Sequence, residues 1–455
     1  MSMSKVATTN VASPVGSSEL GKKFYLDKEF SDVQIVFEVN DEEVGRVPVH
    51  KILLAAHSDV FHTMFNESWK EKNEVKIVDA DVADFKEFLR FFYFGTVNLT
   101  IENVDAIMNL SNKYNVTECK NLCRKFLKAT MTSENMILRY ELAVFLEDES
   151  LKKFCEAMIS VDARDFLKRP GFLQCSKKTL AELMEMKGLK CSEVELFEAC
   201  MSWVKNKSKE ENLTRDIVQS ELGDLFYKIR FGSMTISEFA TLIPLHGNTF
   251  SFVEQTEIIQ MIGDKAFQSK LFNGTREKRC DVNFFEGYKN IWCIRLASQT
   301  HSISPYFVKS LETTTFSVNE TVFFNGFRSS RLCSYSNNTY KILTEVVPSE
   351  ITIVRIPSTS DQSINEEVVL WSGKTNISSE QVNVSLPQPI LISPKFMYEI
   401  RMKQTPPENC SSSSLLKTQV QIDSNFSVQF HRDTFLENDV HCSRGLICRL
   451  NFYRT

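Results

Sequence analysis

The sequence predicts a multidomain α+β protein made of three successive modules: a mixed α/β module, an all-helical module and a C-terminal all-β sandwich. Between Ser31 and Gly95, apolar residues first alternate along a strand and then recur at helical spacing. From Thr132 to about Ile262 the helical spacing continues throughout. From Asp281 onward, short alternating runs recur between turns rich in Ser, Asn and Pro, which is typical of a β-sandwich.

Length and composition bound the function. A chain of 455 residues is long enough for about three domains. Its net charge of −5 provides no large basic field, so no nucleic-acid partner is predicted. No apolar run approaches the roughly 18 residues of a membrane span, so no membrane partner is predicted either. The segment 1–18 has one lysine and no apolar core, so we expect a disordered tail rather than a signal peptide.

The twelve cysteines are scattered without a short-spaced framework, which indicates buried thiols in a reducing compartment. We therefore expect a cytoplasmic protein, with the nucleus as the alternative location. His431, His441, Cys442 and Cys448 lack the paired spacing of a structural zinc site, so no metal is predicted. No phosphate-binding glycine loop is present in the sequence, and no cofactor is predicted.

The first module begins with Val33, Ile35 and Phe37 on alternate positions, which predicts a half-buried strand. The apolar stripe from Phe85 to Phe92 then predicts an amphipathic helix. Ten separated positions agree with one known family: Asp32, His50, Lys51, Leu54, Ala55, Ser58, Phe61, Phe65, Tyr93 and Gly95. With these residues in this order, the segment resembles a BTB (POZ) domain, an association module. The resemblance implies a homodimer, with the aromatic lead-in of Phe24, Tyr25 and Phe30 packing on the partner subunit.

The second module contains Ser192-Glu-Val-Glu195, which has the form of a capping box at the start of a helix. Trp203 and the triplet 229–231 match best in a helical succession that resembles a BACK domain. BACK is the module that follows BTB in cullin adaptors. The segment 263–282 is basic and has no sustained period, so we expect a solvated linker there.

The third module alternates clearly over 396–403 and 382–386. The stretches 315–327, 386–402 and 444–453 are similar to a PHR domain, and the similarity stops at 328–331, where the family has a small glycine-containing turn. The predicted modules are a disordered tail (1–20), a BTB domain (21–130), a BACK domain (131–262), a linker (263–282) and a PHR-like β-sandwich (283–455).

The combined resemblance implies a substrate-specific adaptor of a cullin-3 RING ubiquitin ligase. Cullin-binding BTB domains carry a hydrophobic-x-acid motif where this chain has Trp69-Lys70-Glu71, so Trp69 and Glu71 are candidate contacts. The alternative is a solvated loop with the tryptophan folded against the domain. By analogy Phe61, Phe65 and Tyr114 are placed beside this surface, and Phe61 and Phe65 are equally compatible with a core position.

The target-binding site is expected in the loops of the β-domain, because the inward residues of its strands are committed to packing. The leading candidate is a loop over 328–338 with Arg328, Arg331 and Tyr335, and the alternative is a surface loop with no partner. The sequence does not identify the target protein. No enzyme activity is predicted: Asp32, His50 and Lys51 suit a structural hydrogen bond better than acid–base catalysis. The rival function is a cytoskeletal or transcriptional BTB scaffold that binds no cullin.

Overall fold

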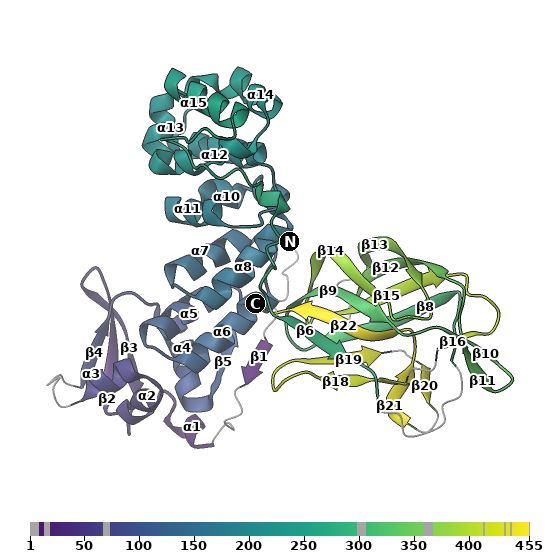
Figure 1. Cartoon of the computed structure of the whole chain (residues 1–455). Helices are drawn as coiled ribbons and strands as arrows, with labels where there is room; N and C mark the ends of the chain where they lie inside the picture. Colours follow the sequence, from purple (N-terminus) through teal and green to yellow (C-terminus); the bar gives the residue numbers. More distant parts are fainter. Residues whose placement is uncertain are drawn as a thin grey trace, which may run out of the picture. The chain divides into compact units, whose positions relative to one another are not determined.

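A computed structural model describes residues 9–12, 19–66, 73–297, 306–357, 367–412, 415–431, 434–436 and 439–454 (Figure 1). The chain divides into two compact units, residues 1–155 and residues 156–455. Among the described residues, none of the helices combines the length and the apolar character needed to cross a bilayer.

The first unit contains a small sheet in the order β3-β2-β4, in which β2 pairs antiparallel with β3 and parallel with β4. Val33, Ile35 and Phe37 are buried as predicted, and Phe37 packs against Phe85 of the helix α4. Val36, on the opposite face, is buried as well, so the centre of β2 is covered on both faces. The strands are β1 (Thr9–Ala12), β2 (Val33–Val39), β3 (Glu42–Val49), β4 (Glu74–Ile77) and β5 (Thr96–Leu99).

The prediction of a disordered tail over 1–20 is wrong at two places, because β1 lies within it and α1 begins at Glu19. β1 pairs antiparallel with β5. Four residues of backbone pairing leave no apolar period in the sequence, so the polar composition of the tail gave no signal of the strand.

The helices of this part follow the predicted stripes. α4 buries its Phe85, Phe88, Leu89 and Phe92 face and ends at Gly95, whose φ of 66° suits glycine at a helix C-terminus. The helices are α1 (Glu19–Phe24), α2 (Lys51–His57), α3 (Asp59–Phe65), α4 (Val82–Phe94), α5 (Val104–Lys113), α6 (Thr117–Ala129), α7 (Met136–Phe145) and α8 (Glu149–Val161).

The second unit begins as a succession of short helices (Figure 1). Ser192 forms the predicted capping box with Glu195, and Thr235 and Ser251 form two more. The buried Trp203 donates its indole N–H to the carbonyl of Cys175 at 3.1 Å. The helices are α9 (Ala163–Phe166), α10 (Pro170–Gln174), α11 (Lys177–Glu185), α12 (Glu193–Ser208), α13 (Arg215–Leu222), η1 (Gly223–Lys228), η2 (Phe231–Ser233), α14 (Ile236–His246), η3 (Gly247–Thr249), α15 (Phe252–Gly263) and η4 (Arg279–Asp281).

The segment 263–282 connects these helices to the β-domain. Most of its residues are exposed, but two of them depart from the prediction of a solvated linker. Phe272 and Arg279 are both buried. Arg276 donates to the backbone carbonyls of Asp264 and Phe267 at 3.0 and 3.1 Å. Arg276 also donates to the carbonyl of Met261 in α15, and Arg279 donates to the carbonyls of Met184 and Met186. These two arginines hold the segment against the helices, because a guanidinium can satisfy several carbonyl groups at once.

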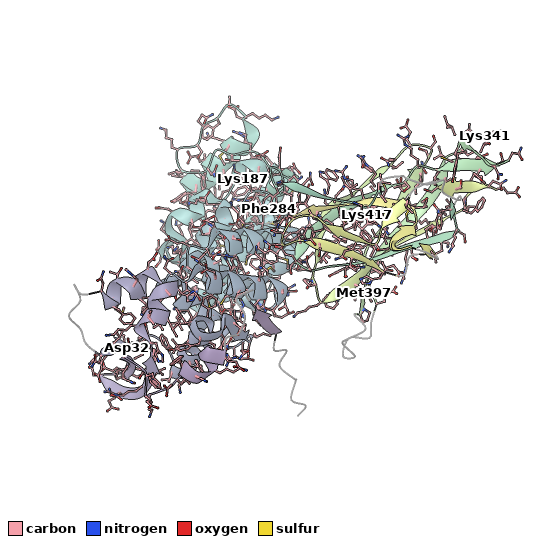
Figure 2. All side chains as sticks on the ribbon, turned by 90° about the horizontal axis from the view of Figure 1, so that it is seen from below. Asp32, Lys187, Phe284, Lys341, Met397 and Lys417 are labelled. Carbon is pink, nitrogen blue, oxygen red and sulfur yellow. The ribbon has the colours of Figure 1, made fainter. Side chains whose placement is uncertain are left out.

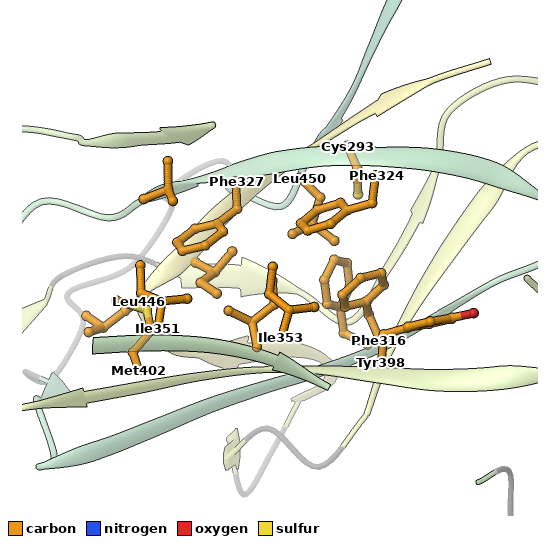
Figure 3. Close-up of a cluster of buried hydrophobic side chains, with 14 of the residues drawn as sticks. Cys293, Phe316, Phe324, Phe327, Ile351, Ile353, Tyr398, Met402, Leu446 and Leu450 are labelled. Atoms are coloured by element: carbon orange, nitrogen blue, oxygen red, sulfur yellow. The ribbon is translucent and has the colours of Figure 1, made fainter. Parts of the chain in front are cut away.

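The β-domain is a sandwich of a six-stranded sheet, β13-β12-β15-β8-β19-β18, and a four-stranded sheet, β14-β9-β22-β6. Figure 3 shows Phe316, Ile353 and Tyr398 of the larger sheet facing Phe324 and Leu450 of the smaller one. Two smaller sheets, β11-β10-β16-β7 and β17-β21-β20, complete the described part. The predicted alternation over 396–403 is confirmed as β15, although Glu399 is buried and bonded to Thr315 and Arg401.

The strands of this domain are β6 (Asn290–Ile294), β7 (Tyr306–Phe307), β8 (Leu311–Val318), β9 (Val322–Ser329), β10 (Cys333–Ser336), β11 (Thr339–Ile342), β12 (Val347–Pro357), β13 (Val368–Ile377), β14 (Asn383–Ile392), β15 (Phe396–Gln404), β16 (Cys410–Ser412), β17 (Leu415–Lys417), β18 (Gln419–Gln421), β19 (Ser427–His431), β20 (Thr434–Leu436), β21 (Asp439–Arg444) and β22 (Ile447–Tyr453).

Candidate protein-interaction surfaces

The residues Asp32, His50 and Lys51 form a structural joint between β3 and α2. The Lys51 backbone N–H donates to Asp32 Oδ1 at 2.8 Å. The His50 N–H donates to the Tyr93 hydroxyl at 3.2 Å, and His50 Nδ1 lies 2.8 Å from the same oxygen. Burial raises the pKa of Tyr93 well above its usual value, so the hydroxyl stays protonated. These bonds confirm the structural interpretation of the group.

A second joint fixes helix α3, which leads into the candidate cullin-binding motif. Ser58 caps α3: its Oγ accepts from the Phe61 N–H at 3.1 Å and donates to the Tyr114 carbonyl at 2.5 Å. The rings of Phe61 and Tyr114 stack with centroids 4.3 Å apart. Both residues are buried, which agrees with the core alternative for Phe61 and places the Tyr114 ring in the core as well. They hold α3 against α5.

Phe65 is the last residue of α3 and is half-buried. Its ring stacks on Phe61 at 5.8 Å, and Lys51 Nζ lies 6.0 Å from its centroid. Part of this ring therefore remains available at the surface. Trp69 and Glu71 lie outside the described residues, so their role stays a prediction.

The three aromatic residues of the lead-in differ in how far they are buried. Tyr25 donates its hydroxyl to the carbonyl of Lys86 at 2.7 Å, and burial raises its pKa to about 12. Phe24 is half-buried, with its ring 5.3 Å from that of His50. Phe30 is 63% exposed. Of the three candidate dimerisation residues, Phe30 is thus the one that would gain most from burial against a second subunit.

The helical region contains a buried ion pair that the sequence gave no sign of. Arg279 Nε donates to Glu193 Oε2 at 3.0 Å, and the two side chains are 1% and 3% exposed. The Arg279 guanidinium also donates to the carbonyls of Met184 and Met186. The Glu193 carboxylate also accepts from the Arg230 N–H at 2.8 Å. This pair locks 279–281 to α11 and α12.

The predicted target-binding loop over 328–338 is not a loop. Arg328 lies within β9 and donates to Asn383 Oδ1 at 2.6 Å. Tyr335 lies in β10, which pairs with β11 to form a hairpin. Its turn is Asn337-Asn338, with φ of 48° and 59°, and this pair of positive values is typical of a tight hairpin turn.

The three target-binding candidates are therefore spread over different elements. Arg331 is exposed in the connection between β9 and β10. Arg328 and Tyr335 belong to two different sheets. Tyr335 packs on Tyr340 at 4.9 Å and on Phe307 at 6.2 Å. The turn residues Asn337 and Asn338 are exposed, as is Lys341 of β11, which Figure 2 shows at the outer end of the β-domain.

The fold and these surfaces define a class of protein: a multidomain interaction protein with a small α/β association module, a helical module and an appended β-sandwich. The comparisons with known proteins name the first two. Residues 22–131 match the model of the BTB/POZ domain. Residues 136–243 match the BACK model, described as BTB And C-terminal Kelch. The chain carries a BTB domain followed by a BACK domain, and BTB–BACK proteins are generally adaptors or scaffolds.

Relatives of this chain among known proteins are also named for a BTB/POZ domain. The chain is 29% identical to human BTB/POZ domain-containing protein 3 over 198 residues, which cover 43% of this chain and 38% of that protein. It is 30% identical to mouse BTB/POZ domain-containing protein 6 over 198 residues, 43% of this chain and 37% of the relative. The match thus spans well under half of each relative. Neither family model reaches the β-sandwich, so its resemblance to a PHR domain stays a prediction.

Proposed function

We propose that this protein is a substrate-specific adaptor of a cullin-3 RING ubiquitin ligase. In this proposal the BTB domain dimerises and, together with the BACK domain, holds the cullin, while the β-sandwich recruits a target protein. The observation that carries the proposal is the order of domains in one chain, BTB, then BACK, then a separate β-sandwich. We place the activity in the cytoplasm.

The adaptor would make and break no covalent bond. Its contribution is proximity, because a tethered target meets the conjugating enzyme at a high effective concentration. A dimer would present two target-binding domains and add avidity. The Ser58–Tyr114 joint supports the proposal, because it gives α3 a fixed direction just before Trp69 and Glu71.

Binding of the cullin-3 N-terminal region to the full chain, measured by titration calorimetry, tests the proposal. Trp69→Ala and Glu71→Ala are each expected to weaken binding by about 2 kcal/mol or more, roughly thirtyfold, as for an interface hot spot. Lys70→Ala, between the two, is the matched control and should keep the affinity. Light scattering should show the same dimer for all four proteins.

Two results would reject the proposal. Unchanged affinity in both variants would mean that the motif makes no contact with the cullin. No measurable affinity of the unmodified chain would favour a BTB scaffold that never meets a cullin.

A further inference from the structure

The outer face of the four-stranded sheet carries an unusual set of side chains. The strand register places the side chains in rows across β6, β22, β9 and β14. The neighbouring positions Cys293, Leu450, Phe327 and Val384 point into the core (Figure 3), so the intervening rows point outward. The first row is Ile294, Arg449, Arg328 and Asn383, and the second is Trp292, Asn451, Gly326 and Ser385.

The third row of this face is already covered. It contains Tyr453 and Phe323, and the ring of Phe285 packs on them at 5.0 and 5.2 Å. The neighbouring Phe284 lies against Gly188 of the helical region, so closely that a Cβ at Gly188 would come within 2.6 Å of the Phe284 nitrogen (Figure 2). The aromatic row is therefore structural. The open part of the face is the first row together with Trp292 and Ser385, because Asn451 and Gly326 of the second row are buried.

The open part holds two arginines, Arg449 and Arg328, that have no carboxylate partner among the residues that the structure describes. The guanidinium carbon of Arg449 lies 3.2 Å from the ring centroid of Trp292, which fixes the plane of the cation. Arg328 donates to the neutral amide of Asn383. Neither arginine forms an ion pair with any acidic group in the described part of the chain.

The two cations also disfavour each other. Arg328 and Arg449 are direct register partners on adjacent strands, and like charges in that position repel. Burial and the neighbouring Arg328 together lower the pKa of Arg449. Arg449 Nε is buried with no acceptor among the described atoms. A carboxylate placed over the half-buried guanidinium groups of this pair would relieve the repulsion and accept from their outer N–H groups.

Apolar side chains flank the two cations. Trp292, Ile294 and Leu296 follow one another on every second position of the edge strand β6 and its continuation, and they are 39%, 49% and 39% exposed. Tryptophan and arginine are the residues most enriched at binding hot spots. The surface therefore offers two fixed positive charges beside an apolar strip.

We infer that the surface around Arg328, Arg449 and Trp292 binds a segment of a partner protein in which carboxylates stand next to a large apolar side chain. The carboxylates would pair with the guanidiniums, and the apolar side chain would cover the strip on β6. This inference rests on the proposed function, because it specifies where and how the β-sandwich would recruit a target. It moves the binding surface from the β10–β11 hairpin to the sheet face.

Selection of a library of random displayed peptides on the immobilised full-length chain tests the chemistry. Enriched peptides should combine Asp or Glu with Leu, Ile, Phe or Trp. A synthetic enriched peptide is then titrated by fluorescence polarisation. Arg328→Glu/Arg449→Glu should weaken its binding by about tenfold or more. Lys395→Glu, a charge reversal of an exposed lysine after β14, is the matched control and should bind as the unmodified chain does.

Exchanging the charges between peptide and protein separates a loss of charge pairing from a loss of folding. A peptide with its acidic residues changed to Lys should bind the double variant better than it binds the unmodified chain. If the double variant has a lower unfolding midpoint, Arg328→Gln replaces it. This variant keeps a donor for Asn383 and should weaken binding about threefold.

Several outcomes would overturn the inference. One such outcome is a selection that enriches no peptides, or only basic or purely apolar ones. Another is equal binding of the peptide by the double variant and by Lys395→Glu. Loss of binding in Arg331→Glu/Tyr335→Ala alone would assign recognition to the hairpin. Cullin-3 binding, measured on the same variants, separates the two proposals: it should be unaffected by the double variant. A chain that binds the peptide but no cullin would refute the adaptor function and leave this surface standing.

Discussion

Replacement of Arg279 by methionine should loosen the helical region far more than its position in a basic connecting segment suggests. Methionine keeps much of the apolar stem of the side chain but removes the guanidinium. The Glu193 carboxylate, 3% exposed, would then lose its ion-pair partner, and the carbonyls of Met184 and Met186 would lose their donor. Removing one partner of a buried pair costs about 3–5 kcal/mol. Even the lower figure is roughly a hundredfold in the equilibrium of local opening.

Hydrogen exchange of the full chain, followed by mass spectrometry, measures the local opening of α11 and α12. Arg279→Met should accelerate exchange there by about a hundredfold or more. Lys278→Met is the matched control, since Lys278 is exposed next to Arg279. The double variant Glu193→Gln/Arg279→Met should exchange more slowly than Arg279→Met, because it buries no unpaired charge.

Equal exchange in Arg279→Met and Lys278→Met would refute the reasoning, as it would show that the ion pair holds nothing in place. A double variant no better than Arg279→Met would show that lost packing, not the unpaired carboxylate, dominates the cost.

Two further predictions concern the first unit. Phe30→Ser should shift the mass measured by light scattering from dimer toward monomer without lowering the unfolding midpoint, because Phe30 is 63% exposed in the single chain. Val78→Ser, at an apolar residue that is 70% exposed and is not a dimerisation candidate, is the control, and an unchanged dimer in Phe30→Ser would contradict the role of Phe30. Burial raises the pKa of Asp148, but hydrogen bonds from Arg124 and the Leu151 N–H outweigh it and leave the pKa lowered. Its stabilisation is therefore present above the unfolded-state pKa of about 3.9 and is lost as the pH falls through the folded-state value. Asp148→Asn should speed hydrogen exchange in α6 at pH 7, and its difference from the unmodified chain should shrink as the pH falls through the folded-state pKa of Asp148; a difference that does not shrink in acid would refute the assignment.

The local periodicity of apolar residues predicted most of the helices and strands. The apolar stripe of α4, the alternation along β2 and β15, and the capping box at Ser192 each depend on residues within about one or two turns, so the sequence shows them directly. The structural role of Asp32, His50 and Lys51 was also predictable, because the three residues stand where the family resemblance places a structural hydrogen bond, and the Lys51 N–H does donate to Asp32.

Other features depended on contacts between residues far apart in the chain. Tyr114 was placed on a surface by analogy, yet stacking on Phe61 across the module buries it. The segment 328–338 looked like a loop because its strands are short and polar, and only pairing of β10 with β11 and β16 makes it a hairpin.

The sequence by itself determined the order of the modules and the helices and strands that have a regular apolar period. Only the tertiary structure brought Arg279 to Glu193, 86 positions earlier, and set Arg449 beside Arg328 and Trp292. The physical reason is that an apolar period records which face of an element is buried, whereas a buried ion pair or a cross-strand row depends on register and packing between distant segments. Nothing in the local sequence around Arg279 or Arg449 distinguishes them from solvated arginines.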